Sequence, residues 1–450
     1  MFPPHPRPVA GDAERDALAA WAASGAMALT GRADGPPLGP PDRLVPGLQR
    51  FAAIVRDRSA RLGREVSLDP VALLGERAAI AGLRRRGTTS CGGATRLVRA
   101  GDGGWLAVSL PRPADRELLP AWLGIDDPPD DPDRPAAASG APDPADAGPS
   151  DELWAAVADA VGRRPAADVA QRAWLLGLPV SVPPTREPAP PPAAPGPLAP
   201  LAVRATAVPG AAPGPSTLAD VVVADLSSVW AGPLCGSLLA LAGARVLKVE
   251  STGRPDGSRR GPPAFFDLMN GHKQGVALDL TTTSGWTALW RLLADVDVVI
   301  EGSRPRALEQ HGIVAADLVA GGRPRVWVSV TGHGRAPPGR DRVAFGDDAA
   351  VAGGLVAADE SGPCFCADAV ADPAAGLAAA AACLDALTVG GGWVLDVALA
   401  DVAAHLAGPT LVPPDGEMPL AAPPRARPVT ARGPALGEDG AGRGPTLHAP

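Results

Sequence analysis

Asp372 is the residue of this sequence best placed to do chemistry. It precedes Pro373 in the segment ADPAAGL (371–377), ahead of an Ala-rich run that predicts a helix over 374–390. A carboxylate at a helix start accepts hydrogen bonds from free backbone N–H groups, so a plain capping role is the simplest interpretation. The same carboxylate could act as a nucleophile toward a thioester or phosphoryl group. Residue chemistry alone favours the capping role.

Three rare polar residues stand out against a composition dominated by Ala, Gly, Pro and Arg. Lys248 and Lys273 are the only lysines among 41 cationic residues, and Asn270 is the only asparagine. Asn270 and Lys273 share the segment LMNGHKQG (268–275), which we interpret as a loop before a strand. Such a cationic loop suits a phosphorylated ligand, and Arg304 in the segment SRPR offers a further anion-binding group. A solvated loop is the alternative.

Two further loops could line a ligand site. The segment DLSSVWAGP (225–233) lacks the spacing of a dinucleotide fingerprint, yet it can present backbone N–H groups to an anion at a helix start. Glu250, at the end of the next predicted strand, could accept a ribose hydroxyl or pair with a cation, and we favour the pairing. The segment TTSCGGATR (88–96) could close over a site or form a turn before a hairpin.

The overall composition excludes several classes of partner. The 450 residues carry a net charge of −8, which argues against nucleic acid and against an anionic membrane surface. The five cysteines are scattered, and the C-x-C at 364–366 lacks a second ligand pair, so we expect reduced, buried thiols and no metal site. The N-terminus shows no signal-peptide pattern, and we expect a cytoplasmic protein.

Three Pro-rich stretches divide the chain. They cover 126–150, 183–216 and 408–450, and we expect a disordered insertion, a linker and a disordered tail, because such segments bury too little apolar surface to offset their ordering entropy. The folded parts would then be 10–182 and 217–407.

The segment 218–335 alternates apolar strand patterns with helical ones, which is typical of a parallel sheet covered by helices. The sequence thus predicts an α/β fold: a Rossmann-like parallel sheet with helices on both faces, plus a smaller α+β domain. Ligands of such sheets bind beyond the carboxyl ends of the strands. We therefore expect the site among the loops that follow residues 226, 250, 280, 302 and 332.

The two halves of the chain share a weak internal sequence similarity. Residues 24–55 resemble 353–384 in a small-residue turn, a Gly-Pro, an Asp and a Gly-Leu that opens a helix. Asp42 is the counterpart of Asp372, displaced by one position relative to the following glycine. Compositional bias could also produce such a similarity. If both halves form sites, either aspartate could be the nucleophile.

The motifs of the second half together resemble family III CoA-transferases, the group that contains formyl-CoA transferases and α-methylacyl-CoA racemases. The resemblance lies in the order and spacing of DLSSVWAGPLCGSLLALAGARVLKVES, FFDLMNGHKQGVALDL, DVVIEGSRPRALEQHGI, VWVSVTGHGR, FGDDAAVAGGL and ADPAAGL. It implies a Rossmann-like large domain, a smaller domain, an interlocked homodimer, and coenzyme A as the group carried. Segments of the first half resemble later parts of the family, so the chain looks permuted.

The resemblance also implies residue roles. Asp372 matches the family's nucleophile, which attacks an acyl-CoA and carries CoA as an aspartyl thioester to a carboxylic acid, with no permanently bound cofactor. The residues that match CoA-contacting positions are Val229, Trp230, Ala231, Gly232, Asn270, Lys273, Gly302, Ser303 and Arg304. Those that match the lid loop are Cys91, Gly92 and Gly93.

Some positions depart from the family pattern. Trp230 replaces a polar residue of the formyl-CoA transferases, and Gly302-Ser303 replaces their Asn-Phe pair. Gly346 stands where racemases carry a catalytic histidine, so a racemase ranks second to a transferase. A catalytically silent acyl-CoA-binding protein is the third hypothesis. The acyl donor and the acceptor acid are not identified by these motifs.

Overall fold

The computed structural model describes residues 11–125, 149–184, 202–209, 213–413 and 417–441. The predicted disordered insertion at 126–150 lies almost wholly outside these residues. The same holds for much of the predicted linker at 183–216.

The centre of the protein is an eight-stranded sheet in the order β13-β7-β6-β5-β8-β9-β12-β4. All neighbouring strands are parallel except β4, which runs antiparallel to β12 at one edge. The strands are β4 (Arg204–Val208), β5 (Val222–Asp225), β6 (Arg245–Ser251), β7 (Gln274–Leu278), β8 (Val298–Glu301), β9 (Val326–Thr331), β12 (Gly392–Ala398) and β13 (Gly440–Ala441).

The six central strands have the doubly wound order 3-2-1-4-5-6, which confirms the predicted Rossmann-like sheet. Alternate residues of each strand face opposite sides: Val223 and Val298 lie in one apolar core, whereas Ala224 and Val299 lie in another. Burial on both faces explains why the strands appear in the sequence as continuous apolar runs. The chain reverses direction across the sheet between β5 and β8, so the crevice lies beyond their carboxyl ends.

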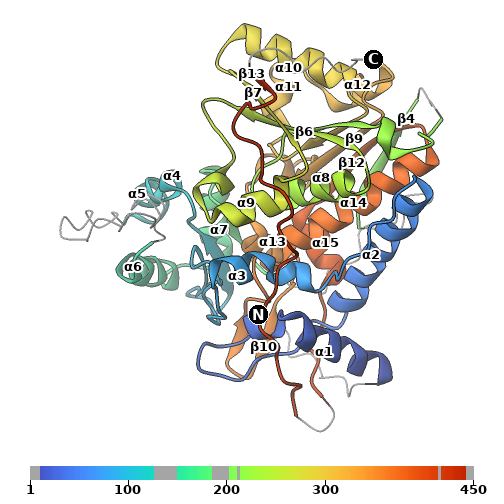
Figure 1. Cartoon of the computed structure of the whole chain (residues 1–450). Coiled ribbons are helices and arrows are strands. Elements are labelled where there is room, and N and C mark those ends of the chain that lie inside the picture. The colour runs from blue at the N-terminus through green and yellow to red at the C-terminus, as the bar shows by residue number, and fades with distance from the viewer. Residues whose placement is uncertain (1–10, 126–148, 185–201, 210–212, 414–416, 442–450) are drawn as a thin grey trace.

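Helices cover both faces of this sheet (Figure 1). On one face, α14 (Ala371–Val389) packs against α8 (Ala231–Leu241), α2 (Leu44–Arg61) and α15 (Leu399–Leu406). On the other face lie α10 (Thr283–Asp295), α11 (Arg306–Glu309) and α12 (Ala315–Ala320). The helix α14 is long and apolar enough to cross a membrane, but 83% of its apolar window is buried here, as in the core helix of a soluble protein.

The first half of the chain divides differently from the predicted 10–182 segment. Side chains of α1 (Asp12–Ser24) and α2 share one core with α8 and α14. A second core joins the hairpin β1 (Thr95–Arg99) and β2 (Trp105–Ser109) to nearby helices. These helices and the third strand are α5 (Leu119–Leu123), α6 (Asp151–Gly162), α7 (Ala166–Leu175) and β3 (Val180–Ser181). The smaller α+β unit therefore begins near residue 95, and the preceding residues belong to the large core.

The remaining short elements connect these layers. They are α3 (Glu76–Ala81), α4 (Pro113–Arg116), α9 (Pro263–Asn270), α13 (Gly346–Ala352), and the hairpin of β10 (Ala357–Asp359) with β11 (Gly362–Cys364).

Parts of the predicted linker and of the predicted disordered tail form ordered structure within the described residues. Within the predicted linker, β4 completes an edge of the main sheet. Within the predicted tail, Arg427 forms an ion pair with Glu76, and Asp439 accepts a hydrogen bond from the Gly275 backbone. Partners from distant segments fix the tail over 417–441, and it ends as strand β13 beside β7.

Candidate active site

Asp372 lies in the first turn of α14 but does not cap it. The N-cap residue is Val370, and it makes no side-chain capping bond. The Asp372 backbone N–H donates to the Ala369 carbonyl at 2.9 Å, whereas its carboxylate accepts no hydrogen bond from any described residue. The capping interpretation is therefore wrong, and the carboxylate oxygens are available to attack a substrate.

Close packing places Asp372 beside the crevice. A Cβ on Gly376 would come within 2.5 Å of the Ala231 carbonyl oxygen, so the starts of α14 and α8 meet. A Cβ on Gly346 would come within 2.6 Å of a carboxylate oxygen of Asp372. Only glycine at 346 leaves room for this carboxylate.

The backbone around the site is strained. Val229, before α8, has φ 73°, and Ala367 and Ala369, before α14, have φ 52° and 43°. Residues with a Cβ seldom adopt the left-handed region, and a β-branched valine there is a clear outlier. Such strain persists where the surroundings hold it, and it clusters at functional sites.

Four aspartates and one arginine surround the start of α14. We call Asp347, Asp348, Asp368 and Asp372 the acidic cluster. Arg77 of α3 binds Asp368 through two hydrogen bonds, at 2.8 Å and 2.5 Å, and Asp368 is fully buried. The Asp347 carboxylate accepts from the Ala369 backbone N–H at 3.2 Å.

Asp348 is held by structural bonds. Its carboxylate accepts from the Phe345 backbone at 2.8 Å, from the Ser109 hydroxyl at 2.9 Å and from the Ser181 hydroxyl at 3.3 Å. It thereby ties α13 to the small sheet. Among the four cluster aspartates, Asp372 is the one without such bonds.

The cluster favours protonated carboxyl groups. Burial raises the pKa of Asp372 to about 7; the charge of Arg77 opposes this rise, and the other three aspartates add to it. Burial likewise raises the pKa of Asp347 to about 6 and that of Asp348 to about 7. A carboxyl group that titrates near neutral pH in a crevice is a candidate for catalysis.

The three rare polar residues lie in one buried network beneath the 226–233 loop. Lys273 donates to Asp225 at 2.7 Å, to the Pro233 carbonyl at 2.8 Å and to Asn270 at 3.0 Å. Lys248 donates to Asp256 at 2.6 Å and to the Ser227 carbonyl. Asn270 ends helix α9 rather than lying in a loop, and its amide donates to the Phe266 carbonyl. In this structure these side chains bind protein atoms, and their contact with CoA stays a prediction.

The charges of this network keep one carboxylate ionised. Burial would raise the pKa of Asp225, but the charges of Lys273 and Lys248 outweigh burial and hold that pKa below its usual value. Burial lowers the pKa of Lys273, against the effect of Asp225. The ion pairs therefore fix the loop that follows β5.

The other predicted contact residues line the crevice more openly. Gly302, Ser303 and Arg304 are exposed after β8, and a Cβ on Gly302 would come within 3.1 Å of the Ser227 side chain. The loops after β5 and β8 thus adjoin at the switch point, as predicted. Val229 is half-buried, whereas Ala231 and Gly232 are buried at the start of α8.

Trp230 is buried between Arg77 and α9. Its ring lies edge-on to Phe265 at 5.2 Å and beneath the Arg77 guanidinium at 5.4 Å. Its indole Nε1 is buried with no hydrogen-bond partner in the described part of the chain. An unpaired buried donor is uncommon and calls for a partner.

The predicted lid loop lies close to the acidic cluster. The buried Cys91 thiol donates to the Ala367 carbonyl at 3.4 Å. A Cβ on the exposed Gly92 would come within 3.3 Å of Arg77, and Gly93 has φ 81°. The loop therefore reaches the strained segment before α14, and its role as a lid stays a prediction.

Glu250 and the cysteines have the surroundings that the simpler prediction gave them. Glu250 pairs with Arg259 at 2.5 Å, which confirms the favoured pairing. The five thiols are free and buried, and burial raises the pKa of Cys364 to about 11 and that of Cys366 to about 12. A thiol in that state is inert.

Asp42 has different surroundings from Asp372. Its backbone N–H donates to the Pro409 carbonyl at 2.9 Å, and its side chain lies against Gly408. The helix that follows it, α2, packs directly against α14. The internal similarity thus corresponds to two adjoining helices. Of the two matching aspartates, Asp372 lies in the acidic cluster and Asp42 does not.

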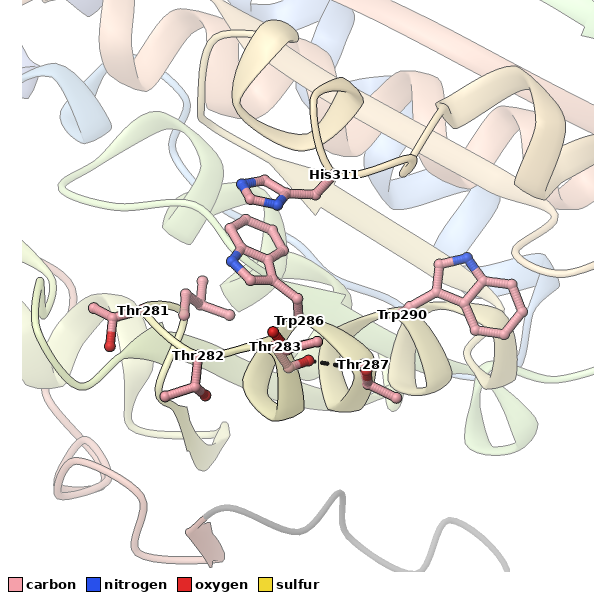
Figure 2. Close-up of a pocket in the computed structure, with 8 residues that line it drawn as sticks. Thr281, Thr282, Thr283, Trp286, Thr287, Trp290 and His311 are labelled. Atoms are coloured by element: carbon pink, nitrogen blue, oxygen red, sulfur yellow. Dashed lines mark hydrogen bonds between the residues drawn. The ribbon is translucent and has the colours of Figure 1, made fainter.

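A surface pocket of about 660 Å³ lies beyond the carboxyl end of β7 (Figure 2). Trp286 stacks on His311 with ring centroids 3.5 Å apart, and four threonines surround them. Trp290 on the same side of α10 is 48% exposed. The pocket lies on the crevice edge of the sheet, and none of its lining residues belongs to the acidic cluster.

Sequence reasoning missed Arg77, Asp347 and Asp368 as parts of the site. Asp347 stands in the quoted segment FGDDAAVAGGL, and Asp368 lies three positions before the quoted segment ADPAAGL, so both lie in or beside a recognisable motif. Arg77 had no such signal, because its partner Asp368 is 291 positions away.

Comparisons with known proteins agree with the motifs. Residues 218–434 match the model of CoA-transferase family III. A succinyl-CoA–D-citramalate CoA-transferase of Chloroflexus aurantiacus is 35% identical over 148 residues, which cover 31% of this chain and 37% of that protein. A succinate–glutarate CoA-transferase of Agrobacterium fabrum is 31% identical over 207 residues, which cover 41% of this chain and 51% of that protein.

A solved structure, a CaiB/BaiF family protein from Brucella suis, is 28% identical, covers 44% of this chain and 55% of its own, and has a TM-score of 0.38. The chain spans about a third to a half of the length of the curated relatives cited above. The family match covers 218–434, so the permuted order inferred for the first half stays a prediction. Residues 218–434 of this chain therefore match CoA-transferase family III and are similar to transferases of that family.

Proposed function

We propose that the protein transfers coenzyme A from an acyl-CoA to a carboxylic acid through a covalent intermediate on Asp372. The observation that carries this proposal is the unbonded Asp372 carboxylate at the start of a buried helix, beside the crevice of the sheet. Its elevated pKa makes the oxygen a stronger nucleophile than an ordinary carboxylate, while much of it is still ionised near neutral pH.

The reaction proceeds in two balanced halves. The ionised Asp372 oxygen attacks the thioester carbonyl, the C–S bond breaks, and CoA leaves as a thiolate, which gives a mixed anhydride. The thiolate attacks the Asp372 carbonyl carbon and releases the first acid as its carboxylate, which leaves an aspartyl-CoA thioester. The acceptor carboxylate reverses these steps and departs as the new acyl-CoA. The thioester bond energy is kept throughout, so no ATP is needed.

The crevice offers contacts for CoA. The exposed Gly302, Ser303 and Arg304 adjoin the loop of Val229, and the Arg304 guanidinium suits a phosphate. The unpaired Nε1 of Trp230 could donate to a carbonyl of the bound thioester. The interlocked dimer and the cytoplasmic location implied earlier stay predictions.

The racemase alternative is less well supported. A second proton-transfer base would need a side chain at 346, yet a Cβ there would come within 2.4 Å of the Ala369 carbonyl oxygen. The backbone beside Asp372 would have to move before a histidine could fit.

The same geometry gives a steric prediction for Gly346→Ala. The added methyl would displace the Asp372 carboxylate, and we expect the rate of CoA transfer to fall by about tenfold to a hundredfold, since misplacement by about 1 Å costs that much. Steady-state assays at saturating acyl-CoA measure the loss. Gly253→Ala is the control, because a Cβ at 253 meets nothing within 4 Å. Equal rates for Gly346→Ala and wild type would contradict the assigned contact.

Trapping the covalent adduct tests the proposed function. The full chain is incubated with succinyl-CoA, acetyl-CoA or formyl-CoA, quenched with hydroxylamine, digested and analysed by mass spectrometry. We expect a hydroxamate on the peptide of Asp372, and its absence in Asp372→Asn.

Asp42→Asn serves as the matched control and should keep the adduct. A label on Asp42 would assign the chemistry to the other half. CoA binding without any label would favour the silent binding protein. Deuterium exchange at Cα of a 2-methylacyl-CoA without acyl transfer would favour the racemase.

A further inference from the structure

We propose that Arg77, from the first half of the chain, is the positioning residue that fixes and ionises Asp372, so that one chain assembles its reaction site from both halves. Arg77 lies outside the segment 218–434 that matches the family. The role of Arg77 in catalysis rests on the proposed function, whereas its effect on the position and ionisation of Asp372 does not.

The geometry begins with the segment that precedes α14. Asp368 lies between the two left-handed residues Ala367 and Ala369, four positions before Asp372. Strain of this kind needs bonds to hold it. Arg77 supplies a two-pronged ion pair to Asp368, at 2.8 Å and 2.5 Å, which defines direction as well as distance.

Other residues of the first half hold the same segment. The Ala367 backbone N–H donates to the Thr30 hydroxyl at 2.9 Å, and the Ala367 carbonyl accepts from the Cys91 thiol. From the second half, Asp347 accepts the Ala369 N–H. Residues from three separate parts of the first half thus set where α14 begins, and therefore where the Asp372 carboxylate lies.

Arg77 also acts on the Asp372 carboxyl group through its positive charge. The groups that act on the Asp372 carboxyl are Arg77 from α3, Asp347 and Asp348 from α13, and Asp368 from the preceding loop. Arg77 is the one cation among them. Its guanidinium is bonded to Asp368 and lies over the Trp230 ring, and these contacts hold it beside the acidic cluster.

The proposal makes two predictions of opposite sign. Arg77→Met removes the cation, so the midpoint of Asp372 ionisation should rise by about one pH unit or more. Asp368→Asn removes a like charge, so that midpoint should fall. In the double variant Arg77→Met/Asp368→Asn the two effects should largely cancel.

The readout is the ionisation of Asp372 itself. The infrared carboxyl band, measured against pH in each variant and corrected by subtraction of the same variant carrying Asp372→Asn, gives the midpoint without any turnover. Arg32→Met is the matched control: it breaks another ion pair between the halves, Arg32–Asp359, which has no part in the acidic cluster. Its midpoint should equal that of the wild type.

Folding is checked on each variant, because a buried Asp368 without its arginine destabilises the protein. The double variant removes both charges and stays informative if Arg77→Met does not fold. The proposal would be overturned if the midpoint of Asp372 ionisation were the same in Arg77→Met, Asp368→Asn and wild type. It would also be overturned if both single variants shifted that midpoint in the same direction.

A second readout distinguishes this proposal from the proposed function. Under single-turnover conditions, the pH midpoint of adduct formation should move with the infrared midpoint. Opposite infrared shifts without any adduct in the wild type would keep Arg77 as the residue that tunes Asp372 and would reject the transferase. An adduct with unmoved midpoints would keep the transferase and reject Arg77.

Discussion

Asp372→Asn should reduce CoA transfer by at least about a thousandfold, because the amide cannot form the acyl anhydride and the other aspartates of the cluster are held by their own hydrogen bonds. The loss should appear in kcat with little change in CoA affinity, since the residues proposed to contact the CoA phosphates lie on other loops. Steady-state transfer assays and CoA titration calorimetry measure the two quantities separately. A residual rate above a few per cent would show that Asp372 is not the nucleophile.

The same substitution should stabilise the fold at alkaline pH. The folded pKa of Asp372, about 7, lies above the value near 3.9 of an unfolded chain, so ionisation in the folded state costs free energy. This penalty is absent below about pH 4, grows as the pH rises, and is complete above about pH 7. We expect Asp372→Asn to gain on the order of 4 kcal/mol of unfolding free energy at pH 8, because the shift is about 3 pH units, and almost nothing at pH 4.

The wild-type activity should follow the same ionisation. Below its pKa of about 7, the fraction of ionised Asp372 falls tenfold per pH unit, so adduct formation should fall with the same slope. Urea denaturation of both proteins at pH 4 and 8 tests the stability, and single-turnover rates test the activity. Equal stabilities of Asp372→Asn and wild type at pH 8 would contradict the elevated pKa.

The sheet could be predicted from sequence because its information is local. Each central strand is a short apolar run between turn residues, and the two-sided burial of Val223 and Ala224 explains the lack of alternation. The switch-point loops follow from strand order. The segment 417–441 could not be predicted in this way, because a Pro- and Arg-rich sequence looks disordered until its distant partners, such as Glu76 and Gly275, are known.

The candidate site could be predicted only in part, because some of its features depend on local sequence and others on contacts between distant segments. The position of Asp372 could be inferred from motif order, but its lack of a capping bond depends on how α14 begins. The role of Arg77 could not be inferred, because it depends on the contact between α3 and the segment 367–369, which are far apart in the sequence. The rarity of Lys248, Lys273 and Asn270 indicated the correct region. Rarity does not specify whether a polar group faces a ligand or the interior.

Lys273→Met should decide between those two roles for the lysine. If Lys273 is structural, as its buried bonds indicate, the substitution leaves the Asp225 carboxylate buried without its main partner. Breaking a buried pair from one side costs about 3–5 kcal/mol of unfolding free energy. It also releases the Pro233 carbonyl in the first turn of α8, so the crevice loop should loosen and transfer should decline.

The controls separate burial from charge. Asp225→Asn/Lys273→Met removes both charges, and much of the lost stability should return because no unpaired ion is left inside. Arg163→Met breaks an ion pair whose side chains are both 66% exposed, and it should cost less than about 1 kcal/mol. Urea denaturation midpoints measure all three. If Lys273→Met instead kept its stability and raised only the KM for acyl-CoA, Lys273 would contact the substrate, as the motif resemblance implies. The buried network would then have to open when CoA binds.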